Sequence, residues 1–176
     1  AAGIPISSLQ SQLGGDVSII RCMPNTPAMI GLGASALFAP DSVEAAHRKL
    51  AEQVTNAAGK TVWVTREDLL DAVTAVSGSG PAYFFALIEA IARTGTELGL
   101  EEEVAMALTV QTALGAASLA AQATEPVATL RENVTSPGGT TAQALQSLRA
   151  HDFDAVVAEA VRQCAARAKA LGEEFG

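Results

Sequence analysis

The segment whose residues could do chemistry is TSPGGTTAQAL, residues 135–145, where a proline and two glycines interrupt a helical pattern that then resumes at once. A helix that begins near Thr140 leaves its first backbone N–H groups without intrahelical partners. Together with about half a positive charge from the helix dipole, these donors attract an anion. Gly138 and Gly139 let an anion approach the backbone and permit positive φ, the proline stiffens the loop, and Thr140 and Thr141 add hydroxyls. The pattern therefore indicates a site for a carboxylate or a phosphate.

The alternative interpretation of these residues is an ordinary turn between two helices. A threonine N-cap on the second helix stabilises a protein by about 0.5–2 kcal/mol and needs no ligand. The SPGG pattern alone leaves both interpretations open, so the elements around it must be considered.

Strands and helices alternate in the first third of the chain, which suggests an α/β layer. We expect a helix in ISSLQSQLGG (6–15), strands at 17–23, 34–39 and 61–64, and a helix over 40–60 that is capped by Asp41 or Ser42. Most sheets have more than three short strands. These elements therefore predict the final part of a larger sheet.

Helices alone are predicted from residue 65 onward. Thr65 and Asp68 form a variant of the capping box before the first helix, and SGSG (77–80) is expected to separate it from the next. Two of the later helices are apolar on nearly all sides, which indicates burial on most sides. We expect a second copy of the chain to complete this core, with a compact monomeric bundle as the alternative.

Composition narrows the classes of partner. The net charge of −8 and the pI near 4.7 argue against nucleic acid and against an anionic membrane surface. Residues 104–124 carry no charge, but their many Ala, Thr, Gln, Ser and Gly residues favour a buried helix over a membrane span. Cys22 and Cys164 stand alone, so neither a disulfide framework nor a metal site is predicted. A reduced, cytoplasmic setting fits best.

Four segments, AAGIPISSL, RCMPNTPA, DAVTAVSGSGPAYFF and ENVTSPGGTTAQAL, occur in this order and closely resemble the pyrroline-5-carboxylate reductase family over essentially the whole chain. SGSGPAY and SPGGTT are its distinctive elements. The resemblance implies an oxidoreductase that reduces 1-pyrroline-5-carboxylate to L-proline with NADPH or NADH, the final step of proline biosynthesis. It implies the C-terminal part of an NAD(P)-binding Rossmann domain in residues 1–65 and an all-helical substrate-binding and dimerisation domain in 66–176. The expected partner is a second copy, in a homodimer with swapped helices that assembles further, for example into a decamer.

One departure from the family is large. The G-x-G-x-x-G fingerprint of a dinucleotide-binding domain is absent, and Gly31 and Gly33 do not replace it. We therefore expect roughly a hundred further residues upstream in the natural protein, as the family's Rossmann domain requires. Whether this chain is active by itself, without the fingerprint, stays open. The alternative function, a non-catalytic helical dimerisation fragment that holds an anion, also stays open. A 2-hydroxy-acid or sugar-acid dehydrogenase would need a lysine in the helical part, and residues 65–148 contain none.

The resemblance also implies roles for single residues. Gly139, Thr140 and Thr141 bind the substrate carboxylate, and the Thr141 hydroxyl contacts the ring nitrogen and relays a proton that solvent supplies. Capping of the first helical turn is the alternative for Thr141. Glu67 balances the charge of the protonated imine, or is simply an acid in a first helical turn, which the dipole favours.

The remaining expected roles concern the cofactor. Asn133 contacts it across the subunit boundary, with a helix C-terminal residue as the alternative. Ala1 and Ala2 have small side chains that let the backbone approach the nicotinamide nucleotide. The MPNTP loop (23–27) lies near the same ring and residues 77–80 line the pocket, unless they are a simple turn and a packing junction.

Overall fold

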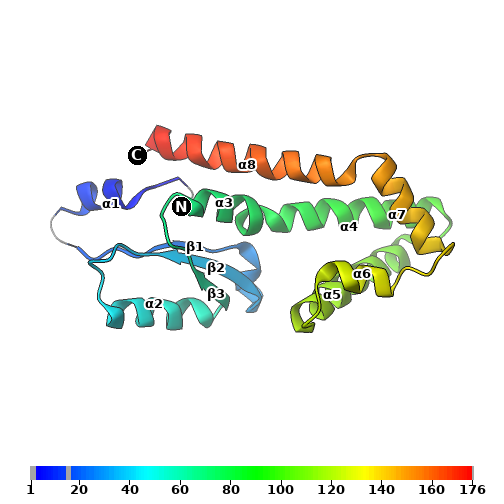
Figure 1. The fold of residues 1–176 in the computed structure, drawn as a ribbon, viewed down its shortest axis with the longest axis horizontal. Coiled ribbons are helices and arrows are strands. Elements are labelled where there is room, and N and C mark those ends of the chain that lie inside the picture. The colour runs from blue at the N-terminus through cyan, green and yellow to red at the C-terminus, as the bar shows by residue number, and fades with distance from the viewer. Residues whose placement is uncertain (1–2, 15–16, 176) are drawn as a thin grey trace. The chain divides into compact units, whose positions relative to one another are not determined.

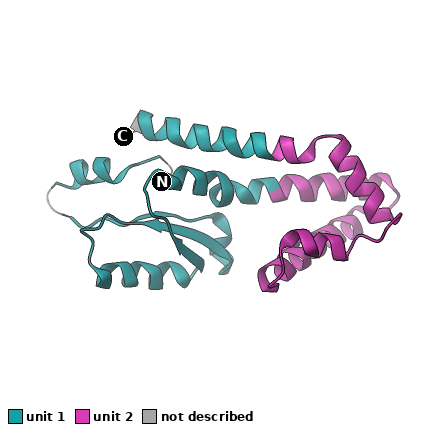
Figure 2. Cartoon of the chain, viewed as in Figure 1, with its two compact units in different colours: residues 1–83, 158–176 teal, residues 84–157 magenta. Residues whose placement is uncertain are grey.

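The computed structural model describes residues 3–14 and 17–175 (Figure 1). They group into two compact units, unit 1 with Ala1–Tyr83 and Ala158–Gly176 and unit 2 with Phe84–Val157 (Figure 2). Ala1 and Ala2, two of the expected cofactor residues, lie outside the described residues. The domain boundary after residue 65 stays a prediction.

Unit 1 contains a small sheet with the strand order β1-β2-β3. β1 (Arg21–Met23) pairs antiparallel with β2 (Gly33–Phe38), and β2 pairs parallel with β3 (Gly59–Trp63). The parallel pair is connected by α2 (Ala45–Asn56), as parallel strands require a crossover. All three strands were expected from the β-rich runs of the sequence, although β1 is shorter than predicted. Leu37 of β2 is 1% exposed and lies in the core.

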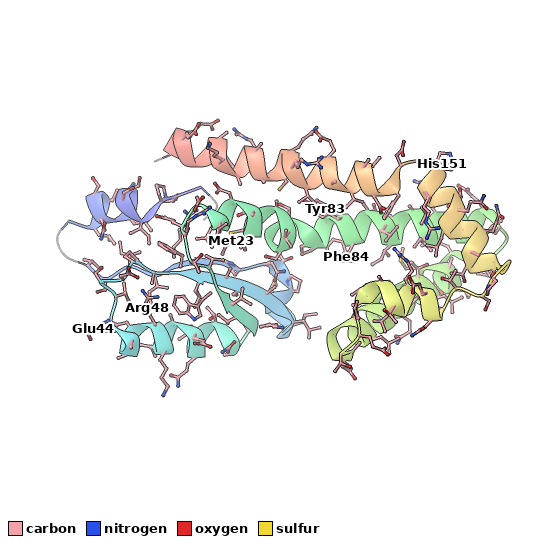
Figure 3. All side chains as sticks on the ribbon, viewed as in Figure 1. Met23, Glu44, Arg48, Tyr83, Phe84 and His151 are labelled. Carbon is pink, nitrogen blue, oxygen red and sulfur yellow. The ribbon has the colours of Figure 1, made fainter. Side chains whose placement is uncertain are left out.

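The start of α2 differs from the prediction. The helix begins at Ala45 after Glu44, without a side-chain cap, so the expected capping by Asp41 or Ser42 is wrong. Residues 40–43 instead form a turn in which the Val43 amide donates to the Pro40 carbonyl at 3.0 Å. Arg48, labelled in Figure 3, supplies the hydrogen bonds before the helix, because its guanidinium donates to the carbonyls of Ala39, Pro40 and Val43.

Helical structure in unit 1 begins with α1 (Ile6–Leu13), which ends at Gly14 as expected. After the sheet come α3 (Leu69–Val73), a π-helical turn η2 (Thr74–Gly78) and the start of α4 (Gly80–Glu97). The expected break at 77–80 is confirmed, because η2 ends at Gly78 and α4 begins at Gly80 with Pro81 in its first turn. The π-helical form of η2 was not predicted. The expected Thr65–Asp68 capping box is absent, because the Asp68 carboxylate accepts from Arg66 instead.

The regular elements of unit 2 are helices joined by turns. It holds most of α4, then α5 (Glu102–Gln122), α6 (Val127–Asn133), α7 (Thr140–Ala150) and the first turns of α8 (Phe153–Phe175). Apolar side chains of α4 and α5 stay uncovered, with Phe84 65% and Leu119 66% exposed. A groove of about 350 Å³ lies between these two helices, with Leu87, Ile91 and Leu108 in its wall.

Two stretches, Leu69–Glu97 and Glu102–Gln122, are long and apolar enough to cross a bilayer by length and composition alone. Only 17% and 11% of their most apolar windows are buried within the chain. Core helices of soluble proteins pass the same test, and burial by a second polypeptide would cover such faces equally well.

Candidate active site

The loop before α7 is a β-turn with the chemistry that its sequence predicts. Ser136 accepts the Gly139 amide at 3.0 Å, and Pro137 and Gly138 occupy the two central positions. Gly138 has φ 70°, which a type II turn demands of its third residue and which glycine adopts without strain. The turn delivers the chain to Gly139, the N-cap of α7, in an extended conformation (φ −80°, ψ 174°).

The first amides of α7 are free donors. The helix begins at Thr140 as predicted, and its first hydrogen bond runs from the Gln143 amide to the Gly139 carbonyl at 3.2 Å. Gly139 has no side chain with which to cap, so the interpretation of this segment as a threonine-capped turn is wrong. Among the described residues, the amides of Thr140, Thr141 and Ala142 have no partner, and both threonine side chains are exposed. The dipole of α7 adds a partial positive charge at the same point.

Asn133 is the last residue of α6 and is exposed. The next turn is held by Thr135, whose hydroxyl donates to the Arg131 carbonyl at 2.6 Å. Asn133 thus lies at a helix end within unit 2, as its alternative interpretation expected, and its amide points to no partner in the described part of the chain. That location leaves its side chain available for a ligand.

Glu67, in unit 1, lies two residues before α3 and so is not part of a first helical turn, contrary to its alternative interpretation. Its Oε1 accepts from the Ile6 amide at 2.8 Å and from Arg21 Nη1 at 3.0 Å. The side chains of Arg21 and Glu67 are 13% and 28% exposed. One carboxylate oxygen therefore joins the start of α1, the start of β1 and the chain before α3.

The segment that precedes α1 is also held from its other side. Gly3 has φ 84°, and a Cβ at this position would lie 2.9 Å from the backbone nitrogen of Gly172 in α8. Only glycine permits this approach. The chain from Gly3 to Ile6 is therefore fixed between α8 and Glu67.

The loop after β1 packs on the π-helical turn, a contact that the sequence did not predict. Asn25 Nδ2 donates to the Ser77 carbonyl at 3.1 Å, and Asn25 Oδ1 accepts the Ala34 amide at 2.8 Å. The Met23 side chain, labelled in Figure 3, packs on Gly78, where an added Cβ would come within 2.6 Å of its Cε. The loop 23–27, expected near the cofactor ring, and residues 77–80, expected to line the pocket, are thus in direct contact.

Two further polar contacts stabilise this turn. The Cys164 thiol of α8 donates to Ser79 Oγ at 3.2 Å, and the Tyr83 hydroxyl donates to the Ala75 carbonyl at 3.0 Å. Cys22, on β1, has a pKa raised by burial, which disfavours the thiolate. Within the described ranges, no three His, Cys, Asp or Glu side chains gather in a way that could hold a metal ion.

The fold and these features define a class of protein: a small α/β unit joined to a helical unit with uncovered apolar helices and an open helix start. Residues 67–171 match the family model for pyrroline-5-carboxylate reductase dimerisation. The chain belongs to the pyrroline-5-carboxylate reductase family.

Individual relatives agree with this assignment. The chain is 48% identical to a pyrroline-5-carboxylate reductase of Pseudomonas aeruginosa, covering all of this chain and 64% of that protein. It matches a solved pyrroline-5-carboxylate reductase of Coxiella burnetii with a TM-score of 0.93 and 41% identity, covering 97% of this chain and 63% of that one. The Plasmodium falciparum pyrroline carboxylate reductase with NADP bound matches with a TM-score of 0.89 and 33% identity, covering 97% and 68%. The chain thus spans about two thirds of the length of these relatives.

Proposed function

We propose that the intact protein reduces 1-pyrroline-5-carboxylate to L-proline with NADPH or NADH, the final step of proline biosynthesis, in the cytoplasm. The observation that carries the proposal is the row of unpartnered amides at the start of α7, in a chain of this family. The substrate is a five-membered cyclic imine with a carboxylate. Its reduction requires that the carboxylate be held, that a proton reach the ring nitrogen and that the imine carbon face the cofactor.

The carboxylate binds at the start of α7. The amides of Thr140 and Thr141 donate to its oxygens, and the extended Gly139 leaves the approach open because it has no side chain. Charge-assisted hydrogen bonds of this kind contribute about 1.5–3 kcal/mol each. They let a chain with a net charge of −8 bind an anion, because the helix dipole acts locally.

Thr141 is the catalytic residue of the proposal. Its exposed hydroxyl contacts the ring nitrogen and relays the proton that this atom gains. Because a threonine hydroxyl is a weak acid, the proton originates from solvent. NADPH or NADH, when bound, supplies the hydride that goes to the imine carbon, and the protein's share is to position the two rings.

Further residues are proposed to contact the cofactor. Asn133, exposed at the end of α6, contacts it from the neighbouring subunit. Ala1 and Ala2 approach the nicotinamide nucleotide, the loop 23–27 lies near the same ring, and residues 77–80 line the pocket. Glu67 contacts the substrate through Oε2, since Oε1 is occupied by Ile6 and Arg21.

A nicotinamide cofactor fits the described residues at one end only. Gly3, whose lack of a side chain permits its close approach to α8, and the loop 23–27, which Asn25 ties to Ala34 and Ser77, are the described segments that we assign to the nicotinamide end. The glycine-rich loop that would hold the pyrophosphate is not in this sequence. We infer that residues 1–65 are the C-terminal part of a Rossmann domain. The second candidate function is a non-catalytic dimerisation fragment that holds an anion. It applies if the natural protein also lacks the glycine-rich loop and so does not bind the cofactor.

The dimer is part of the proposal. The apolar faces of α4 and α5 (Phe84, Leu87, Ile91, Leu108) are uncovered in the single chain, and burial stabilises by about 25 cal/mol per Å² of apolar surface. Helices of a second copy, swapped between subunits, cover these faces, and dimers assemble further, for example into a decamer. Size-exclusion chromatography with light scattering that finds only monomer would refute this part.

The test of the reaction is oxidation of NADPH or NADH by the intact protein, followed by absorbance, with and without the cyclic imine. Thr141→Ala is expected to lower kcat on the order of 10²-fold or more, as loss of a proton relay does. Thr135→Ala is the matched control, since it changes the same residue type in the same loop but removes only a bond to Arg131. Turnover of Thr141→Ala at the wild-type rate would remove the proposed role.

A further inference from the structure

The π-helical turn leaves one carbonyl without its usual backbone partner. Within η2, the Ser79 amide donates to the Thr74 carbonyl at 2.8 Å, a spacing of five residues. The carbonyl of Ser77 would normally accept from residue 81, but that residue is Pro81, which has no N–H. The next amide, of Ala82, donates to Ser79 instead at 3.0 Å.

Asn25 supplies the missing donor from a distant part of the sequence. Its Nδ2 donates to the Ser77 carbonyl at 3.1 Å, across 52 residues of chain. Its Oδ1 accepts the amide of Ala34 at the start of β2, at 2.8 Å. Both ends of one half-buried amide are thus used, and one side chain joins the loop 23–27, the sheet and the π-helical turn.

Asparagine is the residue that this geometry demands. The Ser77 carbonyl needs a donor and the Ala34 amide needs an acceptor, and a primary amide offers both within one rigid plane. An aspartate would keep the acceptor for Ala34 but place an anionic oxygen against the Ser77 carbonyl. Gly78 completes the arrangement, because a side chain there would displace Met23.

We propose that Asn25 is a positioning residue for the reduction, an inference that rests on the proposed function. It fixes the separation between the loop 23–27, which lies near the cofactor ring, and residues 77–80, which line the pocket. The contact between the two segments includes the Asn25 bond and the packing of Met23 on Gly78. Loss of the Asn25 bond lets the loop 23–27 and residues 77–80 shift relative to each other. Misplacement of the reacting groups by about 1 Å lowers a reaction rate on the order of 10²-fold.

The experiment compares Asn25→Asp, Asn25→Ala and the double variant N25A/P81A in the intact protein. Alanine at position 81 restores an N–H that can serve the Ser77 carbonyl, so it repairs the helix without restoring the link to the loop. The matched control is Asn56→Asp, the same substitution at an exposed asparagine whose Oδ1 accepts the Thr61 amide at 3.1 Å. For each variant we measure kcat, KM for the imine, thermal unfolding, and the deuterium isotope effect with cofactor labelled at the transferred hydrogen.

The proposal expects kcat to fall about 10–100-fold in Asn25→Asp and Asn25→Ala, with KM for the imine changed less and the isotope effect increased. N25A/P81A should recover thermal stability but not kcat, and Asn56→Asp should match wild type. The proposal is overturned if kcat of the Asn25 variants stays within about twofold of wild type, or if kcat recovers together with stability in N25A/P81A. A wild-type protein without imine-dependent oxidation would instead refute the proposed function itself, and this inference with it.

Discussion

Removal of the Glu67 carboxylate is expected to destabilise unit 1 well beyond what an exposed ion pair contributes. Oε1 accepts two hydrogen bonds, from the Ile6 amide at 2.8 Å and from Arg21 at 3.0 Å, and Arg21 is only 13% exposed. Both hydrogen bonds end on the carboxylate, and a hydrogen bond to a charged group contributes about 1.5–3 kcal/mol, toward the low end where the group is partly solvated as Glu67 is. Glu67→Ala should therefore lower the free energy of unfolding by about 2–4 kcal/mol. Glu67→Gln, which keeps an acceptor but loses the charge, should cost about half as much.

The assay is a double-mutant cycle with Arg21→Ala, by denaturant unfolding of the intact protein at one fixed protomer concentration. The coupling energy between Arg21 and Glu67 should reach about 1–3 kcal/mol, less than for a fully buried pair because Glu67 is partly solvated. The matched control is the Arg66–Asp68 pair, which is closer at 2.8 Å but 66% and 65% exposed.

Solvent screening should leave the Arg66–Asp68 coupling within the error of the measurement, although Arg66 lowers the pKa of Asp68. Burial of the ion pair, rather than the distance between its charged atoms, therefore determines the coupling energy. Equal coupling energies for the two pairs, or a Glu67→Ala variant as stable as wild type, would refute it.

Two further predictions concern stability and pH. Gly138→Ala should lower the free energy of unfolding by about 1–2 kcal/mol because of its φ of 70° alone, since no atom lies within 4 Å of the added Cβ. Gly80→Ala is the control: the added Cβ is equally uncrowded but the residue is helical, so the stability should stay the same or rise. A Gly80→Ala variant less stable than Gly138→Ala would contradict the turn geometry. Burial raises the pKa of Cys22, so in a Cys164→Ser background its alkylation rate should rise with pH later than that of free cysteine. Because the folded state favours the neutral thiol, stability should fall as pH rises from the unfolded pKa through the folded pKa. Alkylation at the rate of free cysteine would show that this thiol is not desolvated.

Local sequence signals predicted the helix start that carries the proposed site. Pro137 restricts the backbone and Gly138 permits its φ of 70°, and the helix begins at Thr140 as the residue types predicted. The same is true of Gly14, which ends α1. Signals of this kind act over a few residues and need no knowledge of the tertiary fold.

The contacts that connect distant segments could not be predicted in this way. Arg21 and Glu67 are 46 residues apart, and Asn25 and Ser77 are 52 residues apart. Nothing in the local pattern of PNTP distinguishes an asparagine that serves a turn from one that serves a remote carbonyl. Pro81 carried a signal that was available, because its missing N–H leaves the Ser77 carbonyl in need of another donor.

Two incorrect capping predictions have a common physical cause. Thr65 with Asp68, and Asp41 or Ser42, were expected to cap helices on the basis of average preferences. Arginine side chains make the hydrogen bonds instead: Arg66 donates to the Asp68 carboxylate, and Arg48 donates to the carbonyls before α2. Local propensity is a weak guide where a side chain from elsewhere supplies the hydrogen bond.

The most direct measurement of the central claim is a crystal structure of the intact protein grown with L-proline. The account predicts that the proline carboxylate accepts hydrogen bonds from the backbone amides of Thr140 and Thr141, with the ring nitrogen facing the Thr141 hydroxyl. A structure in which proline binds elsewhere, with no ligand at the start of α7, would contradict it.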